Sequence, residues 1–103
     1  MEATIAGINV KVNEEGYLTE FSQWNEDIAK EISLQEEIGE LTEKHWTVLK
    51  YLQNQFENEI PLTIRKVGKS GVTNIKEFYA LFPGGPLKKA TKIAGIPKPV
   101  GCI

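Results

Sequence analysis

Residues 81–103 read LFPGGPLKKATKIAGIPKPVGCI and combine a tight turn, a short amphipathic helix and a tail with two prolines. The turn lies at residues 83–86, because paired glycines between prolines interrupt any regular element. Pro86 can begin the helix, since the first helical position needs no N–H donor, and Gly95 can end it in the left-handed conformation. Apolar or small residues at steps of three, one and three would form its inner face: Leu87, Ala90, Thr91 and Ala94.

The tail after this helix carries Cys102, the only cysteine of the chain. One thiol cannot form an intrachain disulfide or a cysteine zinc cluster, so packing, exchange with another molecule or carriage of a group remain. Pro97 and Pro99 favour the extended polyproline II conformation, in which eight residues reach on the order of 25 Å. We therefore expect residues 95–103 to form a mobile C-terminal arm. Position alone does not distinguish a reactive thiol from an unreactive one.

The rest of the chain predicts a mainly α-helical domain. Residues 8–12 alternate between apolar and polar, and turn residues 13–16 then lead to Tyr17 and Leu18, which predicts a small N-terminal β-hairpin. Four further helices are expected to begin at Ser22, Thr42, Pro61 and Thr73. The last of these would bury Ile75, Phe78, Tyr79 and Phe82. Because 103 residues bury one core only, we expect residues 1–103 to form a single domain, with about five helices in an orthogonal bundle.

Charge is distributed unevenly along the chain. The net charge is only −2, but residues 61–103 hold eight basic residues and one acid, Glu77. A basic surface can bind nucleic acid or an acidic protein, or stabilise a thiolate, the reactive form of cysteine. The candidates to support a Cys102 thiolate are Arg65, Lys92 and Lys98. The alternative is that the acidic and basic halves neutralise each other within the fold.

His45 is the only histidine, and a Cys-His pair can act as nucleophile and base. Its place on the apolar side of its helix favours a hydrogen-bonded core imidazole instead, because no third catalytic group is identifiable. One Cys and one His offer no metal-ligand spacing, and the glycines at 84 and 85 lack the Lys-Ser or Lys-Thr of a phosphate loop. We therefore expect neither a metal nor a cofactor.

The hydropathy of the chain argues against a membrane protein. No stretch approaches the ~20 apolar residues that span a bilayer, and the first residues do not resemble a signal peptide. A cytoplasmic protein is expected, because a free thiol stays reduced there. Aromatic residues at helical spacing favour a packed core, but the lysines among them leave open a helix-turn-helix-like unit in helices three to five that binds nucleic acid.

Residues 81–103 resemble the C-terminal signature of the DsrC/TusE family, which contains the gamma subunit of dissimilatory sulfite reductase and a sulfur-relay protein of tRNA 2-thiouridine synthesis. The likeness extends to the EGYL segment at 15–18, Trp24, the LTEKHW segment ending at Trp46, and residues 61–65. It implies a small, mainly helical protein whose penultimate cysteine, here Cys102, accepts sulfane sulfur as a persulfide from one partner and passes it to another.

Two positions depart from the family pattern. In the sulfite-reductase branch a second cysteine stands eleven residues before the first, where this chain has Thr91. The resemblance therefore implies a single-cysteine protein that cannot form an intramolecular trisulfide. A cysteine at this position would be half-buried at the root of the arm. The family also tends to carry an arginine in the second half of the long helix, where this chain has Gln53.

The resemblance also implies partners. Sulfur donors would be a complex like TusBCD or DsrEFH, and acceptors would be a tRNA thiouridylase or a sulfite-reductase-like enzyme. The protein would perform at most a sulfurtransferase half-reaction. Two other interpretations stay open: the nucleic-acid-binding or regulatory module described above, and a structural subunit that docks on a sulfite-reductase-like enzyme through its tail.

Overall fold

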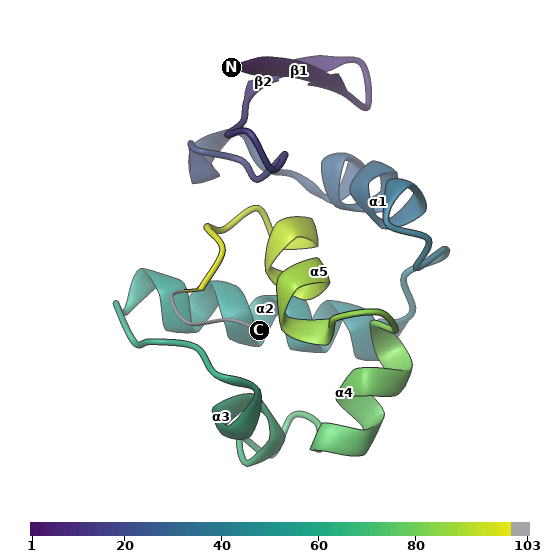
Figure 1. Cartoon of the computed structure of the whole chain (residues 1–103), viewed down its shortest axis with the longest axis vertical. Helices are drawn as coiled ribbons and strands as arrows, with labels where there is room; N and C mark the ends of the chain where they lie inside the picture. Colours follow the sequence, from purple (N-terminus) through teal and green to yellow (C-terminus); the bar gives the residue numbers. More distant parts are fainter. Residues whose placement is uncertain (100–103) are drawn as a thin grey trace.

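The computed structural model describes residues 1–99, which form a two-stranded sheet followed by short helices (Figure 1). The elements in chain order are β1 (Glu2–Ile5), β2 (Ile8–Lys11), the 3₁₀ helix η1 (Phe21–Gln23), α1 (Glu26–Gln35), α2 (Glu43–Glu57), α3 (Ile64–Gly68), α4 (Ile75–Leu81) and α5 (Pro86–Ile93). Five α-helices and an N-terminal hairpin within this range confirm the expected mainly α-helical fold. None of the helices in residues 1–99 is long and apolar enough to cross a membrane.

Helix α5 lies at the centre of the fold, where it contacts α1, α2 and α4 and crosses the long helix α2 (Figure 1). Its inner face is buried as expected: Leu87, Ala90, Thr91 and Ala94. The apolar face of α2 contributes Val48, Leu49 and Leu52 to the same core, whereas Phe56, one turn further on, is exposed. Removal of this apolar surface from water, at roughly 25 cal/mol per Å², is the main force that holds the other helices around α5.

The N-terminal hairpin pairs different segments from those predicted. Strands β1 and β2 are antiparallel and joined by Ala6 and Gly7, whose φ angles of 52° and 77° belong to a two-residue turn that matches the twist of the strands. The predicted partner of β2, Tyr17-Leu18, forms only one isolated bridge, from Leu18 to Val12. Because alanine rarely adopts a positive φ, this turn leaves no clear signal in the sequence.

Three helices begin one to three residues later than predicted. The cap of α1 is Asn25 instead of Ser22, and the cap of α4 is Asn74 instead of Thr73. Helix α3, which was expected to begin at Pro61, is capped by Thr63. In each case the cap side chain accepts a hydrogen bond from the backbone N–H three residues ahead, at 2.8 to 3.0 Å. This bond satisfies an N–H that has no partner within the helix. The expected Thr42 cap of α2 is confirmed.

Helix α4 buries a narrower face than predicted. Phe78 and Phe82 are fully buried, with their rings edge to face and 5.8 Å apart. Ile75 and Tyr79 are exposed, so the expectation that all four residues face the core is wrong for these two. This seven-residue helix packs mainly on α3 and α5, and Ile75 and Tyr79 lie on its exposed surface.

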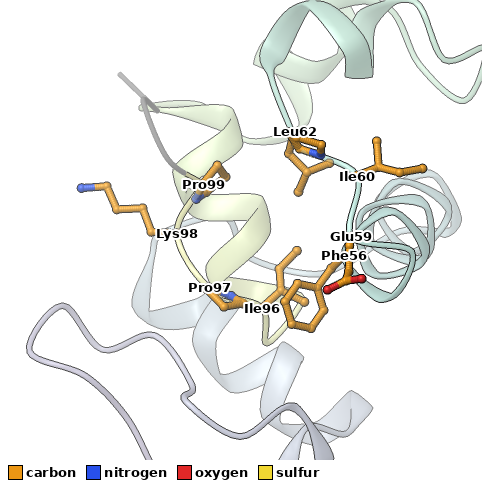
Figure 2. A pocket seen from close by; sticks show the side chains of 9 residues that line it. Phe56, Glu59, Ile60, Leu62, Ile96, Pro97, Lys98 and Pro99 are labelled. Atoms are coloured by element: carbon orange, nitrogen blue, oxygen red, sulfur yellow. The ribbon is translucent and has the colours of Figure 1, made fainter.

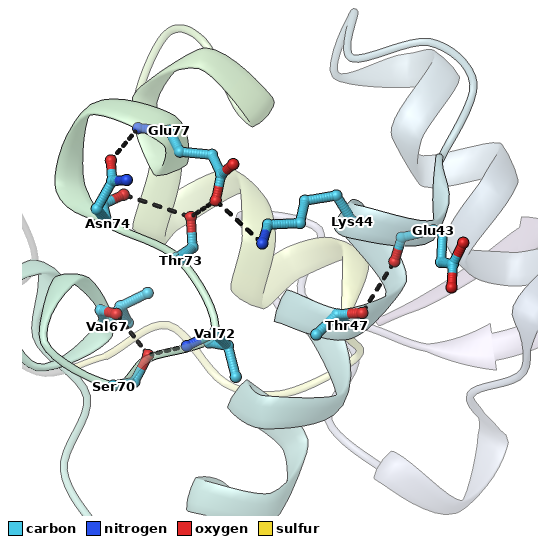
Figure 3. Close-up of polar contacts among 9 residues, drawn as sticks. All are labelled: Glu43, Lys44, Thr47, Val67, Ser70, Val72, Thr73, Asn74 and Glu77. Carbon is cyan, nitrogen blue, oxygen red and sulfur yellow. Dashed lines mark hydrogen bonds and ion pairs between the residues drawn. The ribbon is translucent and has the colours of Figure 1, made fainter.

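A polar link joins the beginning of α2 to the beginning of α4 (Figure 3). The Thr73 hydroxyl donates to the Glu77 carboxylate at 2.6 Å, and Lys44 Nζ lies 3.3 Å from the same oxygen. The hydrogen bond from Thr73 is the largest cause that lowers the pKa of Glu77, and Lys44 adds to it, although partial burial acts in the opposite direction. Thr73 is therefore a partner of Glu77 rather than a helix cap.

Candidate functional site

The C-terminal arm leaves the domain at the end of α5 and runs back past the end of α2 (Figure 1). Cys102 lies outside the described residues, so its surroundings stay a prediction. The structure does describe the root of the arm, as far as Pro99. The contacts of this root determine from where the thiol can reach a partner.

The root begins with a Schellman motif at the end of α5. Gly95 has a φ angle of 76°, in the left-handed region, and its N–H donates to the carbonyl of Lys92 at 3.2 Å. The N–H of Ile96 donates to the carbonyl of Thr91, also at 3.2 Å. Ile96 is 0% exposed. Thus the first two residues of the predicted arm pack as part of the domain. Pro97 is the first exposed residue, and Lys98 and Pro99 are half-buried.

Two side chains from distant segments bond to the last carbonyls of α5. Trp24 Nε1 donates to the carbonyl of Ile93 at 2.8 Å, and Gln53 Nε2 donates to the carbonyl of Ala94 at 2.9 Å. Trp24 also packs on Gly95, where an added Cβ would lie 2.7 Å from Trp24 Cγ. Sequence analysis missed both contacts, because no local pattern relates residues that are 69 and 41 positions apart.

Thr91, which stands at the position of the second family cysteine, is 0% exposed. Its hydroxyl donates to the carbonyl of Leu87 at 2.7 Å and lies 3.1 Å from that of Lys88. A side chain here is covered from solvent, so the expectation of a half-buried position understates its burial.

The two predicted lysines near the arm are both paired with carboxylates. Lys98 lies 3.1 Å from Glu15, and Lys92 lies 3.2 Å from Glu36 and also 5.9 Å from the centre of the Tyr17 ring. These glutamates partly neutralise the lysines, so the field that a thiolate would feel is weaker than the count of bases indicates. The acidic and basic halves therefore meet at this face of the domain.

Arg65, the third predicted supporting cation, lies elsewhere in the fold. It is exposed on α3, and its side chain has no hydrogen bond or ion pair within residues 1–99. Its relation to Cys102 falls outside the described residues and stays a prediction.

An apolar groove of about 390 Å³ lies between the arm and the segment that follows α2 (Figure 2). Phe56, Ile60 and Leu62 line one side, and Ile96 and the two prolines of the arm line the other. Figure 2 shows that the Lys98 side chain points away from the groove, which agrees with its pairing to Glu15.

His45 has the structural role that its position favoured. Its Nδ1 accepts the backbone N–H of Thr42 at 3.1 Å, so Nε2 carries the proton that it donates to the carbonyl of Leu81 at 2.9 Å. The ring also packs edge to face on Phe82, with 5.1 Å between centres. Nδ1 therefore bonds the N-cap of its own helix, and Nε2 joins α2 to the end of α4.

Two further expectations concern helices α3 to α5 and metal ligands. Helices α3, α4 and α5, which a helix-turn-helix-like unit would use, have five, seven and eight residues, and that interpretation stays a prediction. Within residues 1–99, no three His, Cys, Asp or Glu side chains are grouped so that they could hold a metal ion.

Comparison with known proteins decides the family. The family described as "DsrC like protein" matches residues 4–103. The chain belongs to the DsrC family. This match confirms the resemblance drawn from residues 81–103, and it includes the position of Cys102.

Relatives that carry two different names are similar to this chain over nearly its whole length. The gamma subunit of dissimilatory-type sulfite reductase from Nitratidesulfovibrio vulgaris is 35% identical over 103 residues, covering 99% of this chain and 98% of that protein. The sulfurtransferase TusE homologue of Haemophilus influenzae is 40% identical over 108 residues, covering 96% and 97%. The sulfurtransferase TusE of Escherichia coli is 40% identical over 105 residues, covering 94% and 95%.

Solved structures of DsrC proteins share the fold. The NMR structure of Allochromatium vinosum DsrC superimposes with a TM-score of 0.85 at 36% identity and covers the whole of both chains. The crystal structure of the oxidized gamma subunit from Archaeoglobus fulgidus does so with a TM-score of 0.81 at 32% identity, again over both whole chains. The arrangement of five helices and a hairpin is therefore that of the DsrC family.

Proposed function

We propose that this protein is a sulfur-relay carrier in which Cys102 holds sulfane sulfur as a persulfide. The observation that carries the proposal is the family match, which extends through residue 103 and so includes Cys102, the only thiol of the chain. Relatives named sulfurtransferase TusE support a role in sulfur transfer at the level of the family.

The proposed chemistry needs no external oxidant or reductant. The Cys102 thiolate attacks the outer sulfur of a donor persulfide, R–S–SH, so that a new S–S bond forms as the donor's S–S bond breaks. The products are Cys102–S–SH and the donor thiolate, R–S⁻. Delivery to an acceptor thiol repeats this exchange in the opposite direction. Thiol–disulfide exchange proceeds by the same displacement, which depends on the thiolate and on access to it.

The single cysteine sets a limit on this chemistry. Thr91 occupies the position where a second sulfur would lie, and its hydroxyl is engaged with the backbone of α5. The sulfur must therefore pass to another protein, since the chain has no second thiol to receive it. From the family resemblance, we propose a TusBCD- or DsrEFH-like donor and either a tRNA thiouridylase or a sulfite-reductase-like acceptor.

The test is to incubate the reduced protein with a persulfidated donor protein or with inorganic polysulfide and to measure its intact mass. A gain of about 32 Da, one sulfur atom, that maps to Cys102 and is removed by a reductant supports the proposal. Cys102→Ser is the control and should gain nothing. If the wild-type protein gains no sulfur, or if the Cys102→Ser variant gains as much as the wild type, the proposal is wrong.

A further inference from the structure

All four carbonyls at the end of α5 have hydrogen-bond partners. A helix leaves its final four carbonyls without partners inside the helix. In α5 these belong to Thr91, Lys92, Ile93 and Ala94. The Schellman motif satisfies the first two through the N–H groups of Ile96 and Gly95. Trp24 and Gln53 satisfy the other two.

We propose that Trp24 and Gln53 are positioning residues, which fix the direction in which the C-terminal arm leaves the domain. We call these two side chains the clamp. Its purpose rests on the proposed function, because a carrier whose arm starts in a defined direction presents Cys102 to its partners from a restricted volume. Restricting that volume raises the effective concentration of the thiol at a docked partner's site.

Burial makes the two side-chain bonds necessary. Ile93 and Ala94 are both 0% exposed, so water cannot replace a missing donor to their carbonyls. If one donor is removed, its carbonyl stays unpaired or the end of α5 moves toward solvent. Pro97, the first exposed residue of the arm, lies only three positions after Ala94, so a movement of this helix end also turns the arm.

The clamp holds the arm from two sides. Trp24 follows η1 and packs on Gly95, whose missing side chain leaves room for the indole ring. Gln53 comes from α2, which is the second segment that borders the root of the arm. Each donor contacts one peptide unit just before the left-handed turn at Gly95, so together they restrain both position and rotation of that turn.

The first measurement is amide hydrogen exchange in the folded protein. Gln53→Met and Trp24→Phe each remove one donor, while Gln55→Met, on the same helix and with no side-chain hydrogen bond within residues 1–99, is the matched control. Loss of one hydrogen bond is expected to speed exchange of the Gly95 and Ile96 amides about fivefold relative to that of Leu52 in the core. Gln55→Met should leave this ratio unchanged.

The second measurement reports the direction of the arm, which a merely stabilising contact would not alter in the folded state. One nitroxide is attached to Cys102 and a second to an introduced Lys50→Cys, on the exposed side of α2. Pulsed electron paramagnetic resonance should show a broadened or displaced distance distribution in Gln53→Met but not in Gln55→Met. If Trp24→Phe fails to fold, Gln53→Met carries the test alone, because that side chain is only half-buried.

Accelerated exchange at Gly95 and Ile96, together with a changed distance distribution, supports the clamp. Unchanged exchange, or faster exchange with an unchanged distribution, overturns it. Neither measurement depends on the transfer of sulfane sulfur to or from Cys102. A failure of the proposed sulfur-carrier function would instead appear as the absence of a mass gain on Cys102, so the two failures are distinguishable.

Discussion

Gly95→Ala is expected to destabilise the protein by roughly 3 kcal/mol, because two separate costs meet at this residue. The backbone at φ 76° is left-handed, which costs a residue with a Cβ about 1 kcal/mol. The new methyl group would also lie 2.7 Å from Trp24 Cγ and 2.8 Å from Trp24 Cβ, well inside van der Waals contact. Displacement of the indole adds about 1–3 kcal/mol and endangers its bond to the carbonyl of Ile93.

The assay is urea unfolding followed by far-UV circular dichroism, which does not depend on the fluorescence of Trp24. Gly39→Ala is the matched control, because Gly39 has a φ angle of 87° but no atom within 4 Å of an added Cβ. It should lose only the backbone cost, about 1 kcal/mol, with an unchanged dependence on denaturant concentration. Equal losses in the two variants would show that the contact between Trp24 and Gly95 contributes nothing and would refute the reasoning.

Three other predictions follow from single contacts. Glu77→Gln should be less stable than the wild type at neutral pH, because a carboxylate whose pKa is lowered below 4.5 stabilises the fold above that pH. The difference between the unfolding free energies of the two proteins should shrink as the pH falls through the folded-state pKa of Glu77. A difference that does not change with pH would count against this reasoning. Thr91→Cys in a Cys102→Ser background should react with a thiol reagent at least about tenfold more slowly than Cys102 does in the wild type, because position 91 is fully buried; equal rates would contradict that burial. Glu15→Gln removes the exposed ion pair with Lys98 and should change stability by less than about 0.5 kcal/mol, yet it should increase the mobility of a nitroxide on Cys102 at low salt and not at high salt; an effect independent of salt would exclude the ion pair as its cause.

The helices were largely predictable because their signals are local. Each signal acts within a few residues of the chain. For α2 the signals are the cap at Thr42 and the spacing of the apolar residues around Val48 and Leu52, and for α5 they are the proline that begins the helix and the glycine that ends it. Helix starts were missed by up to three residues, since Ser, Thr and Asn near a boundary can all act as caps. The structure selects the one whose side chain reaches the N–H three positions ahead.

The hairpin and the exposed face of α4 were predicted less well for another reason. Strand β2 could pair with the segment before it or with the segment after it. The positive φ of Ala6 allows the tight turn that pairs it with the earlier segment, β1. In α4, Tyr79 has the spacing of a core residue but is exposed, because no element of residues 1–99 covers that side of the helix. Periodicity states which residues share a face, but not how much of that face is covered.

In the candidate site, too, some features were predictable from the sequence and others were not. Cys102, the proline-containing tail and the absence of a second sulfur at Thr91 are properties of the chain itself, and together with the residues 81–103 they were enough to indicate the family and the kind of chemistry. Lys92 and Lys98 were also identified as bases near the arm, but not the glutamates that pair with them.

The sequence by itself determined the approximate positions of the helices, the position of the thiol and that it is the only one, because each of these depends on neighbouring residues or on a count. Only the tertiary structure decided that the arm's first two residues are packed, that Trp24 and Gln53 bond the end of α5, and that Glu15 holds Lys98. These contacts join residues 69, 41 and 83 positions apart. They form because burial of α5 brings those segments together and leaves its last carbonyls without water, a condition that no local pattern in the chain contains.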